Sequence, residues 1–301
     1  MSKDISQPWL KKTLFTALSL TVKPLFNAGI PVSVLRHGLA ISAKTTLTAR
    51  GMRATPLTMG NVPAVRYARN PNTPQAILYL HGGAYRAGSW RTHAALTSHL
   101  AKHSDAAVYV PNYRLAPEHP FPAALNDAMD CYEHLLQQGY HGKHITVMGD
   151  SAGGGLTLSL LLALRENGIA LPAAYVLLSP WADLTHPHRE YSDDAMLTWA
   201  GLDAHADSYA GTEARNHPHI SPALGALEGL PPGLIIVGTR EILLTDAKLL
   251  QQRLHNANSP AHLQVFEGMW HVFPLHAGLL QEADEAITMM VEFALQHTSV
   301  A

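Results

Sequence analysis

The chain has 301 residues, 47% of them hydrophobic and 15% charged, which is typical of a folded globular protein and excludes a disordered or fibrous one. A chain of about 300 residues buries roughly three quarters of its unfolded surface, so one large domain is expected. The net charge of −2 gives no sign of a basic stripe, which argues against a nucleic-acid-binding protein. The only cysteine, Cys131, excludes an intrachain disulfide and indicates a reducing compartment; its apolar helical position predicts a packing residue.

The first segment that needs a decision is "KKTLFTALSLTV" at residues 11–22, which superficially resembles a signal peptide. Its apolar run is too short to span a bilayer, Lys23 and Pro24 interrupt it, and no A-x-A cleavage site follows. We therefore expect a packed or peripheral helix, no transmembrane segment and a cytoplasmic protein.

Short apolar runs alternate with helical patterns through the middle of the chain. The runs lack strict alternation, as expected for strands covered on both faces, and they lie at residues 76–80, 107–110, 145–149, 174–179, 234–238 and 263–266. Apolar residues at three- and four-residue spacing predict helices, as in 125–136 and 279–294. This order predicts a mostly parallel sheet with helices on both faces, and ligands at the carboxyl ends of its strands.

Two segments break the alternation. Residues 1 to about 45 carry helical patterning before any strand, and residues 183 to about 222 form a long insertion rich in His, Asp and Ala. A loop of that length without structure of its own is uncommon, so short helices are expected there. We predict one domain over residues 1–301, with these two segments forming a cap.

The sequence "GDSAG" at residues 149–153 places Ser151 between glycines, with a strand-like run before it and a helical pattern after it. The pattern G-x-S-x-G alone is weak, but this context is the one that a nucleophilic serine on a tight strand-to-helix turn requires. The start of the following helix also supplies free N–H groups and partial positive charge where an oxyanion would form.

A second motif, "HGGAY" at residues 81–85, follows the strand-like run 76–80. Its two glycines permit a bend that directs consecutive N–H groups to one point. Together with the N–H of Ala152, such groups would hold the oxygen of a tetrahedral intermediate. An ordinary glycine turn is the alternative.

A serine nucleophile needs a base, and the base needs a carboxylate that orients it. His271, in "EGMWHVF" after the last strand-like run, is the candidate base. Glu241 directly follows "LIIVGTR" and is the candidate acid, while Asp246 begins a helix, where capping or the helix dipole explains it. The His-Pro-His clusters at 186–188 and 217–219 have no carboxylate or cysteine at ligand spacing, so surface loops rather than a metal site are expected.

Six motifs occur together and in order: "HGGAY", "YRLAPEHPFPAAL", "GDSAGGGL", "SPWADL", "EILLTD" and "EGMWHVF". Over roughly residues 55–295 the chain strongly resembles the hormone-sensitive-lipase-like (family IV) carboxylesterases of the α/β-hydrolase superfamily. Two departures stand out. Ala84 replaces a third glycine of that family, and Glu241 stands where the family more often has aspartate.

The resemblance implies an eight-stranded α/β-hydrolase sheet with a helical cap, and no cofactor or metal. It implies a catalytic triad of Ser151, Glu241 and His271, and an oxyanion hole formed by Gly82, Gly83 and Ala152. Candidates for lining the substrate pocket are Ala84, Trp181, Leu202 and Trp270.

These inferences predict an esterase for short- to medium-chain acyl esters that works through an acyl-enzyme intermediate. A lipase or an amidase with the same triad is the alternative, and so is an inactive small-molecule receptor, which should lack the histidine that His271 provides. The expected partner is a small ester substrate, with no nucleic acid; a homodimer is left open.

Overall fold

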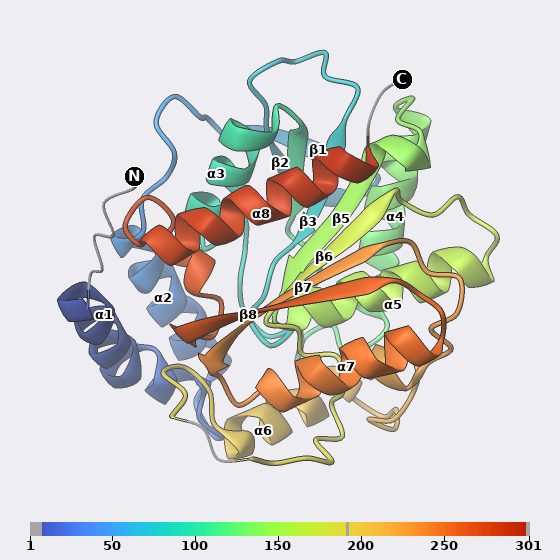
Figure 1. Cartoon of the computed structure of the whole chain (residues 1–301). Coiled ribbons are helices and arrows are strands. Elements are labelled where there is room, and N and C mark those ends of the chain that lie inside the picture. The colour runs from blue at the N-terminus through green and yellow to red at the C-terminus, as the bar shows by residue number, and fades with distance from the viewer. Residues whose placement is uncertain (1–7, 191–192, 299–301) are drawn as a thin grey trace.

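The computed structural model describes residues 8–190 and 193–298, whose centre is one eight-stranded sheet (Figure 1). The strand order is β1-β2-β4-β3-β5-β6-β7-β8; β2 pairs antiparallel with β1 and β4, and all other pairs are parallel. The strands are β1 (Thr55–Met59), β2 (Val62–Tyr67), β3 (Ala76–Leu80), β4 (Ala107–Pro111), β5 (Ile145–Asp150), β6 (Ala174–Leu178), β7 (Gly233–Arg240) and β8 (Ala261–Trp270).

The six strands predicted from apolar runs are confirmed as β3 to β8, the strands that form the parallel part of the sheet. All residues of β3, β4, β5 and β6 are buried, which explains why their sequences do not alternate. The sequence pattern did not reveal β1 and β2. Four of the five residues in β1 are not fully buried, so this edge strand carries no apolar run.

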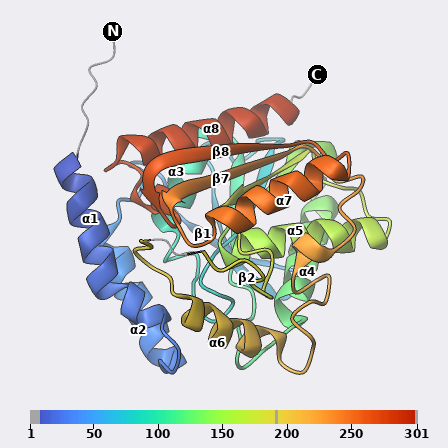
Figure 2. The same ribbon diagram turned by 60° about the horizontal axis from the view of Figure 1, so that its bottom comes forward.

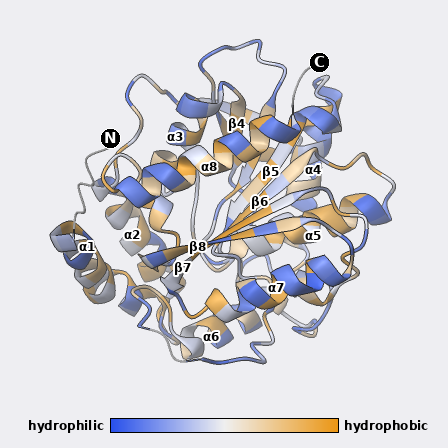
Figure 3. Ribbon diagram, viewed as in Figure 1, coloured by the Kyte–Doolittle hydropathy of each residue, from blue (hydrophilic) through white to orange (hydrophobic). Residues whose placement is uncertain are grey.

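Helices cover both faces of the sheet. Hydrophobic side chains of α5 and α7 form a core with those of β6 and β7, and α3 contacts α8 in the other layer (Figure 1). Apolar residues concentrate in the strands and on the inner sides of these helices (Figure 3). The covering helices are α3 (Ala94–Ser104), α4 (Ala123–Gln137), α5 (Ala152–Glu166), α7 (Leu244–Asn256) and α8 (Gln281–His297).

Three further helices, α1 (Pro8–Thr21), α2 (Val32–Ser42) and α6 (Trp199–Ala210), lie outside these layers (Figure 2). The short turns η1 (Lys23–Phe26) and η2 (Ala43–Thr45) follow α1 and α2, η4 (Pro222–Leu224) ends the insertion, and η3 (Gly142–His144) and η5 (Phe273–His276) adjoin β5 and β8. The insertion thus contains helical structure, as predicted. The predicted cap also includes residues 1–7, 191 and 192, which lie outside the described residues.

Specific contacts hold these outer helices in place. Arg36 on α2 forms a two-pronged ion pair with Glu118 and also donates to the carbonyl oxygens of Arg86 and Ala116. Among the described residues, no helix is long and apolar enough to cross a bilayer.

Candidate active site

Ser151 lies where β5 turns directly into α5. Its backbone has φ 51° and ψ −120°, a conformation that residues with side chains rarely adopt, and Ala152 begins the helix. The neighbouring glycines are required for space: a Cβ on Gly149 would lie 2.2 Å from the carbonyl oxygen of Gly153, and one on Gly153 would lie 2.0 Å from that of Leu80. Only this tight packing of the turn allows the serine to stand at the carboxyl end of β5.

Asp150, the residue before this serine, ties the turn to the loop after β3. Its Oδ1 accepts hydrogen bonds from the Tyr79 hydroxyl at 2.8 Å and from the Gly82 N–H at 3.0 Å, and its Oδ2 lies 3.1 Å from His93 Nε2. Burial raises the pKa of this carboxyl, but His93 and the hydrogen bonds outweigh burial, so the pKa lies below its ordinary value. A fully satisfied carboxylate therefore joins the two loops that frame the serine.

The N–H of Gly82, which the sequence assigned to the oxyanion hole, donates to Asp150 and so connects this loop to the turn at Ser151. The next donors along the loop belong to Gly83 and Ala84, both at positive φ (123° and 54°). The alanine that replaces the third glycine of the family thus occupies a glycine-like conformation in the cavity that Ser151 also lines.

His271 follows β8, and Glu241, which follows β7, holds its imidazole. Nδ1 of His271 lies 2.9 Å from Oε2 of Glu241, and both side chains are buried. Oε1 of Glu241 accepts hydrogen bonds from the Ser179 hydroxyl at 2.8 Å and the Gly238 N–H at 2.6 Å. Burial alone would lower the pKa of His271, but the hydrogen bond and charge of Glu241 outweigh burial and raise it above its ordinary value.

Ser179 is a site residue that sequence reasoning missed. Its hydroxyl donates to Glu241 and accepts the N–H of Val272 at 3.1 Å, so it connects the end of β6 to the loops that carry Glu241 and His271. It lies within the "SPWADL" motif, but no spacing rule gives a function to a serine there. His93 was missed for the same reason, because no motif contains it and only the fold brings it to Asp150.

Several of these groups line one cavity, which contains about 820 Å³ of space free of atoms, part of it open to solvent. Ser151, His271 and Ala84 all line it, and so does Leu202 of α6. The remaining wall combines apolar and polar side chains from the outer helices and from the loops at this end of the sheet. The apolar residues are Leu18, Val22, Phe26, Leu39, Ala43, Met196, Leu197, Val272 and Leu275, and the polar residues are Ser42, Thr45, Thr46, Thr92, His93, Asp150 and His276.

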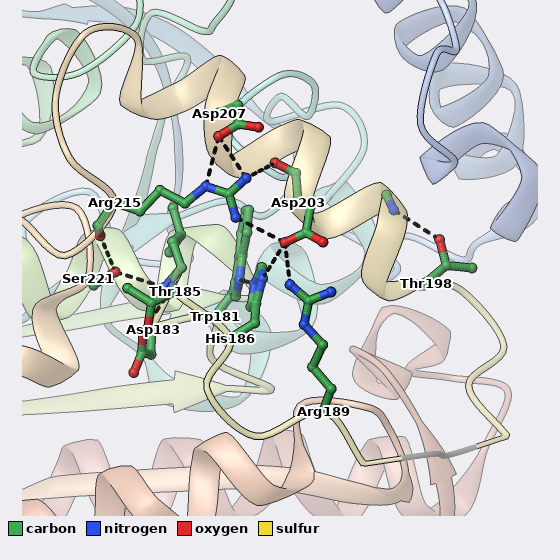
Figure 4. A network of polar contacts seen from close by, with 12 residues as sticks. Trp181, Asp183, Thr185, His186, Arg189, Thr198, Asp203, Asp207, Arg215 and Ser221 are labelled. Carbon is green, nitrogen blue, oxygen red and sulfur yellow. Dashed lines mark hydrogen bonds and ion pairs between the residues drawn. The ribbon is translucent and has the colours of Figure 1, made fainter.

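Trp181 and Trp270, two expected pocket residues, do not line this cavity. The indole N–H of Trp181 donates to His186 Nε2 at 2.8 Å, and the two rings stack with centroids 5.8 Å apart (Figure 4). Trp270 packs edge-on against Phe15 of α1, with ring centroids 6.3 Å apart. Both indoles are therefore structural, since they attach the outer segments to the core.

His186 is buried, whereas Pro187 and His188 are exposed, so the expected surface loop is confirmed for only part of this cluster. Nδ1 of His186 lies 3.1 Å from Asp203 of α6, and this carboxylate also binds Arg189 and Arg215 (Figure 4). Because Nε2 accepts the Trp181 proton, the imidazole is neutral with its proton on Nδ1, and burial lowers its pKa. This network fastens α6 to the segment after β6.

The second histidine cluster serves other contacts. His217 packs against the ring of Phe121, and His219 Nε2 lies 2.9 Å from Glu166. Within residues 8–190 and 193–298, no three His, Cys, Asp or Glu side chains are grouped so that they could hold a metal ion.

Comparison with known proteins decides the family. Residues 77–275 match a family model described as the α/β-hydrolase fold. A crystal structure of an esterase from the bacterial hormone-sensitive lipase family superimposes with a TM-score of 0.90 at 32% identity, covering 98% of this chain and 100% of that one. The chain belongs to the hormone-sensitive-lipase family of esterases.

Other known proteins are similar to this chain over most of their length. An acetyl-hydrolase of Streptomyces hygroscopicus is 43% identical over 79% of this chain and 81% of its own length. An esterase of Acinetobacter venetianus is 35% identical over 79% and 80%. The crystal structure of the esterase EstE5 soaked with p-nitrophenyl butyrate has a TM-score of 0.89 at 34% identity, covering 96% of this chain and 99% of that one.

Asp246, the alternative acid, lies in the first turn of α7 without a capping hydrogen bond, so capping does not explain it. The side chain is buried, and its Oδ2 has no hydrogen-bond partner among the described residues. Burial, together with the nearby carboxylate of Asp183, raises the pKa of Asp246 to about 7. This environment contrasts with that of Glu241, whose two oxygens both have donors.

We predict that Asp246→Asn changes the pH dependence of stability. The carboxyl has a pKa of 3.8 in the unfolded chain and about 7 in the folded protein. Between these values only the folded state retains the proton, so the free energy of unfolding of the wild type falls as the pH rises and then levels off. The amide of Asn stays neutral at every pH. The difference in melting temperature, variant minus wild type, should therefore increase from about pH 5 to about pH 8.

Asp105→Asn is the matched control, because Asp105 has an exposed side chain. Its melting temperatures should run parallel to those of the wild type over the same range. A parallel profile for Asp246→Asn as well would contradict the buried, proton-retaining carboxyl.

Proposed function

We propose that the protein hydrolyses short- to medium-chain acyl esters, with Ser151 as nucleophile, His271 as base and Glu241 as the orienting acid. The hydrogen bond of 2.9 Å between His271 and Glu241, in a cavity that Ser151 also lines, is the observation that carries this proposal. The Ser151 hydroxyl attacks the ester carbonyl while His271 removes its proton, and the alcohol leaves with that proton. Water, activated by the same imidazole, then releases the acid.

The oxyanion that forms during this attack needs donors that have no other acceptor. We assign this function to the N–H groups of Gly83, Ala84 and Ala152, because Gly82 already donates to Asp150. The start of α5 adds its partial positive charge at the same place.

We further propose that α1, α2 and the insertion that contains α6 form a cap over the substrate. Their residues Leu18, Val22 and Leu202 supply apolar wall to the cavity, which supports this proposal. A cytoplasmic location agrees with the single buried thiol of Cys131, and the homodimer stays a prediction.

We predict that Ser151→Ala abolishes esterase activity without unfolding the protein. Loss of the nucleophile should lower kcat by at least ~10³, as in other serine triads. Kinetics on a p-nitrophenyl ester, together with circular dichroism, measure both effects. An organophosphate should label the wild type at Ser151 and leave the variant unlabelled; equal labelling of the variant would show that another residue is the nucleophile.

We predict that Glu241→Gln lowers kcat by ~10³ to 10⁴ while the fold is kept, comparable to the loss of the orienting acid in other triads. The amide has one oxygen and one NH₂ group. Its NH₂ group therefore faces either the N–H of His271 or the donors of Ser179 and Gly238, so that in both cases two donors oppose each other.

Asp246→Asn is the control for this variant and should keep kcat within a few-fold of the wild type. If Asp246→Asn loses turnover and Glu241→Gln retains it, the acid is Asp246.

We predict that kcat/KM is highest for acyl chains of up to ~8 carbons, because Leu18, Val22 and Leu202 of the outer helices wall the cavity and limit the length of the acyl chain that it admits. A series of p-nitrophenyl esters of increasing chain length measures this. Leu202→Ala should shift the preference to longer chains. Leu250→Ala, which creates space in the core between α7 and the sheet, should leave the preference unchanged. A steady rise of kcat/KM towards long-chain esters would contradict a capped cavity.

A further inference from the structure

The charge of this chain is divided unevenly along the sequence, which the net value of −2 conceals. Residues 5–104 contain twelve Lys and Arg residues and no Asp or Glu, whereas residues 105–301 contain eight Lys and Arg and 22 Asp and Glu. The first third of the protein is therefore strongly cationic. From the total charge we expected no basic region, and the composition of this segment shows that this expectation is wrong.

Exposed apolar side chains gather in the same part of the chain. Among the described residues, six large hydrophobic side chains are exposed, and five of them lie between residues 9 and 47. Their exposed fractions range from 47% to 72%, and they are Trp9, Leu20, Val34, Ile41 and Leu47. Scattered exposed apolar residues are normal, but such a concentration in one short segment marks a contact surface.

The helical spacing places most of these residues on the outer sides of α1 and α2. Residues 9, 12, 13, 16 and 20 are exposed and recur at three- and four-residue steps, and residues 34, 37, 41 and 44 continue this pattern on α2 and η2. The opposite sides carry the buried Phe15, Leu18 and Leu35. Both views show α1 and α2 along one flank of the molecule, outside its layers (Figures 1 and 2).

We call this surface the N-terminal face and define it by Trp9, Lys12, Leu20, Val34, Ile41 and Lys44. Two nearby cations are not available to a partner, because Lys11 pairs with Glu282 and Arg36 pairs with Glu118. Lys12 and Lys44 are exposed, and no acidic residue exists within the segment to neutralise them.

We propose that the N-terminal face binds an anionic phospholipid surface. Exposed tryptophan and leucine can enter the boundary between headgroups and acyl chains, and lysines bind the anionic headgroups at the same depth. This proposal goes beyond ester hydrolysis. Since Leu18 and Val22 of the same segment line the cavity, such binding would hold the catalytic site next to a phase in which apolar esters concentrate.

The composition of the face favours lipid over the other occupants. A second copy, docked face to face about a twofold axis, would bring the same cations together without an acidic residue of the segment to pair with them. A nucleic acid would satisfy the lysines but would leave the apolar side chains in water. A fluid anionic lipid surface accommodates both the lysines and the apolar side chains.

The experiment measures sedimentation of the purified protein with vesicles of phosphatidylcholine alone and of phosphatidylcholine mixed with phosphatidylglycerol. We expect binding to the mixed vesicles, weaker binding to the neutral ones, and a decrease with salt because the charges are screened. The double variant Lys12→Glu/Lys44→Glu should bind the mixed vesicles at least ~10-fold more weakly. Its matched control, Lys143→Glu/Lys248→Glu, changes the net charge equally at exposed positions elsewhere and should bind like the wild type.

Trp9→Ser/Leu20→Ser tests the apolar part and should also reduce binding several-fold. Both face variants should keep wild-type kcat/KM on a water-soluble acetate ester, which separates this proposal from the assignment of the active site. The proposal is overturned if the wild type does not bind the mixed vesicles, if neutral vesicles bind equally well, or if the two charge variants behave alike. Loss of a dimer in Trp9→Ser/Leu20→Ser with unchanged vesicle binding would overturn it in favour of self-association.

Discussion

The turn from β5 into α5 holds Ser151 in a backbone conformation that costs of order 1–3 kcal/mol and persists only when its surroundings over-determine it. Those surroundings are visible. The Ser151 N–H donates to the carbonyl of Leu178 at 2.9 Å, and the Trp181 N–H donates to the Ser151 carbonyl at 2.9 Å. The end of β6 and the residues after it thus hold the turn by hydrogen bonds. Because Gly149 and Gly153 lack side chains, their backbones can approach those of Gly153 and Leu80. The catalytic end of the sheet is organised around this turn.

Buried carboxylates carry this organisation to the other loops. Asp150 reaches the loop after β3 through Gly82, and Glu241 reaches the ends of β6 and β8 through Ser179 and His271. Each of these two carboxylates has hydrogen-bond partners at both oxygens, which offset the cost of burying a polar group. Asp246 shows the opposite case. Its Oδ2 has no hydrogen-bond partner among the described residues, and its raised pKa favours the protonated, neutral form. Acids of similar chemistry thus differ in function because of their hydrogen-bond partners.

The cavity wall comes from two parts of the chain. The residues around Ser151 lie within the segment 77–275 that matches the family model, whereas α1 and α2, which supply part of the cavity wall, lie outside it. The shared segment explains the membership of the family.

The sequence by itself determined the parallel part of the sheet, because buried strands must be apolar throughout, and it determined the turn around Ser151, because only small residues fit there. It also placed Glu241 and His271 after strands whose carboxyl ends meet at one edge. Only the tertiary structure decided which contacts those positions make: that Gly82 serves Asp150, that Ser179 serves Glu241, and that Trp181 turns towards His186. The first two of these pairs lie 68 and 62 residues apart and leave no periodic signal in a sequence, so their pairing follows from the packing of the whole fold.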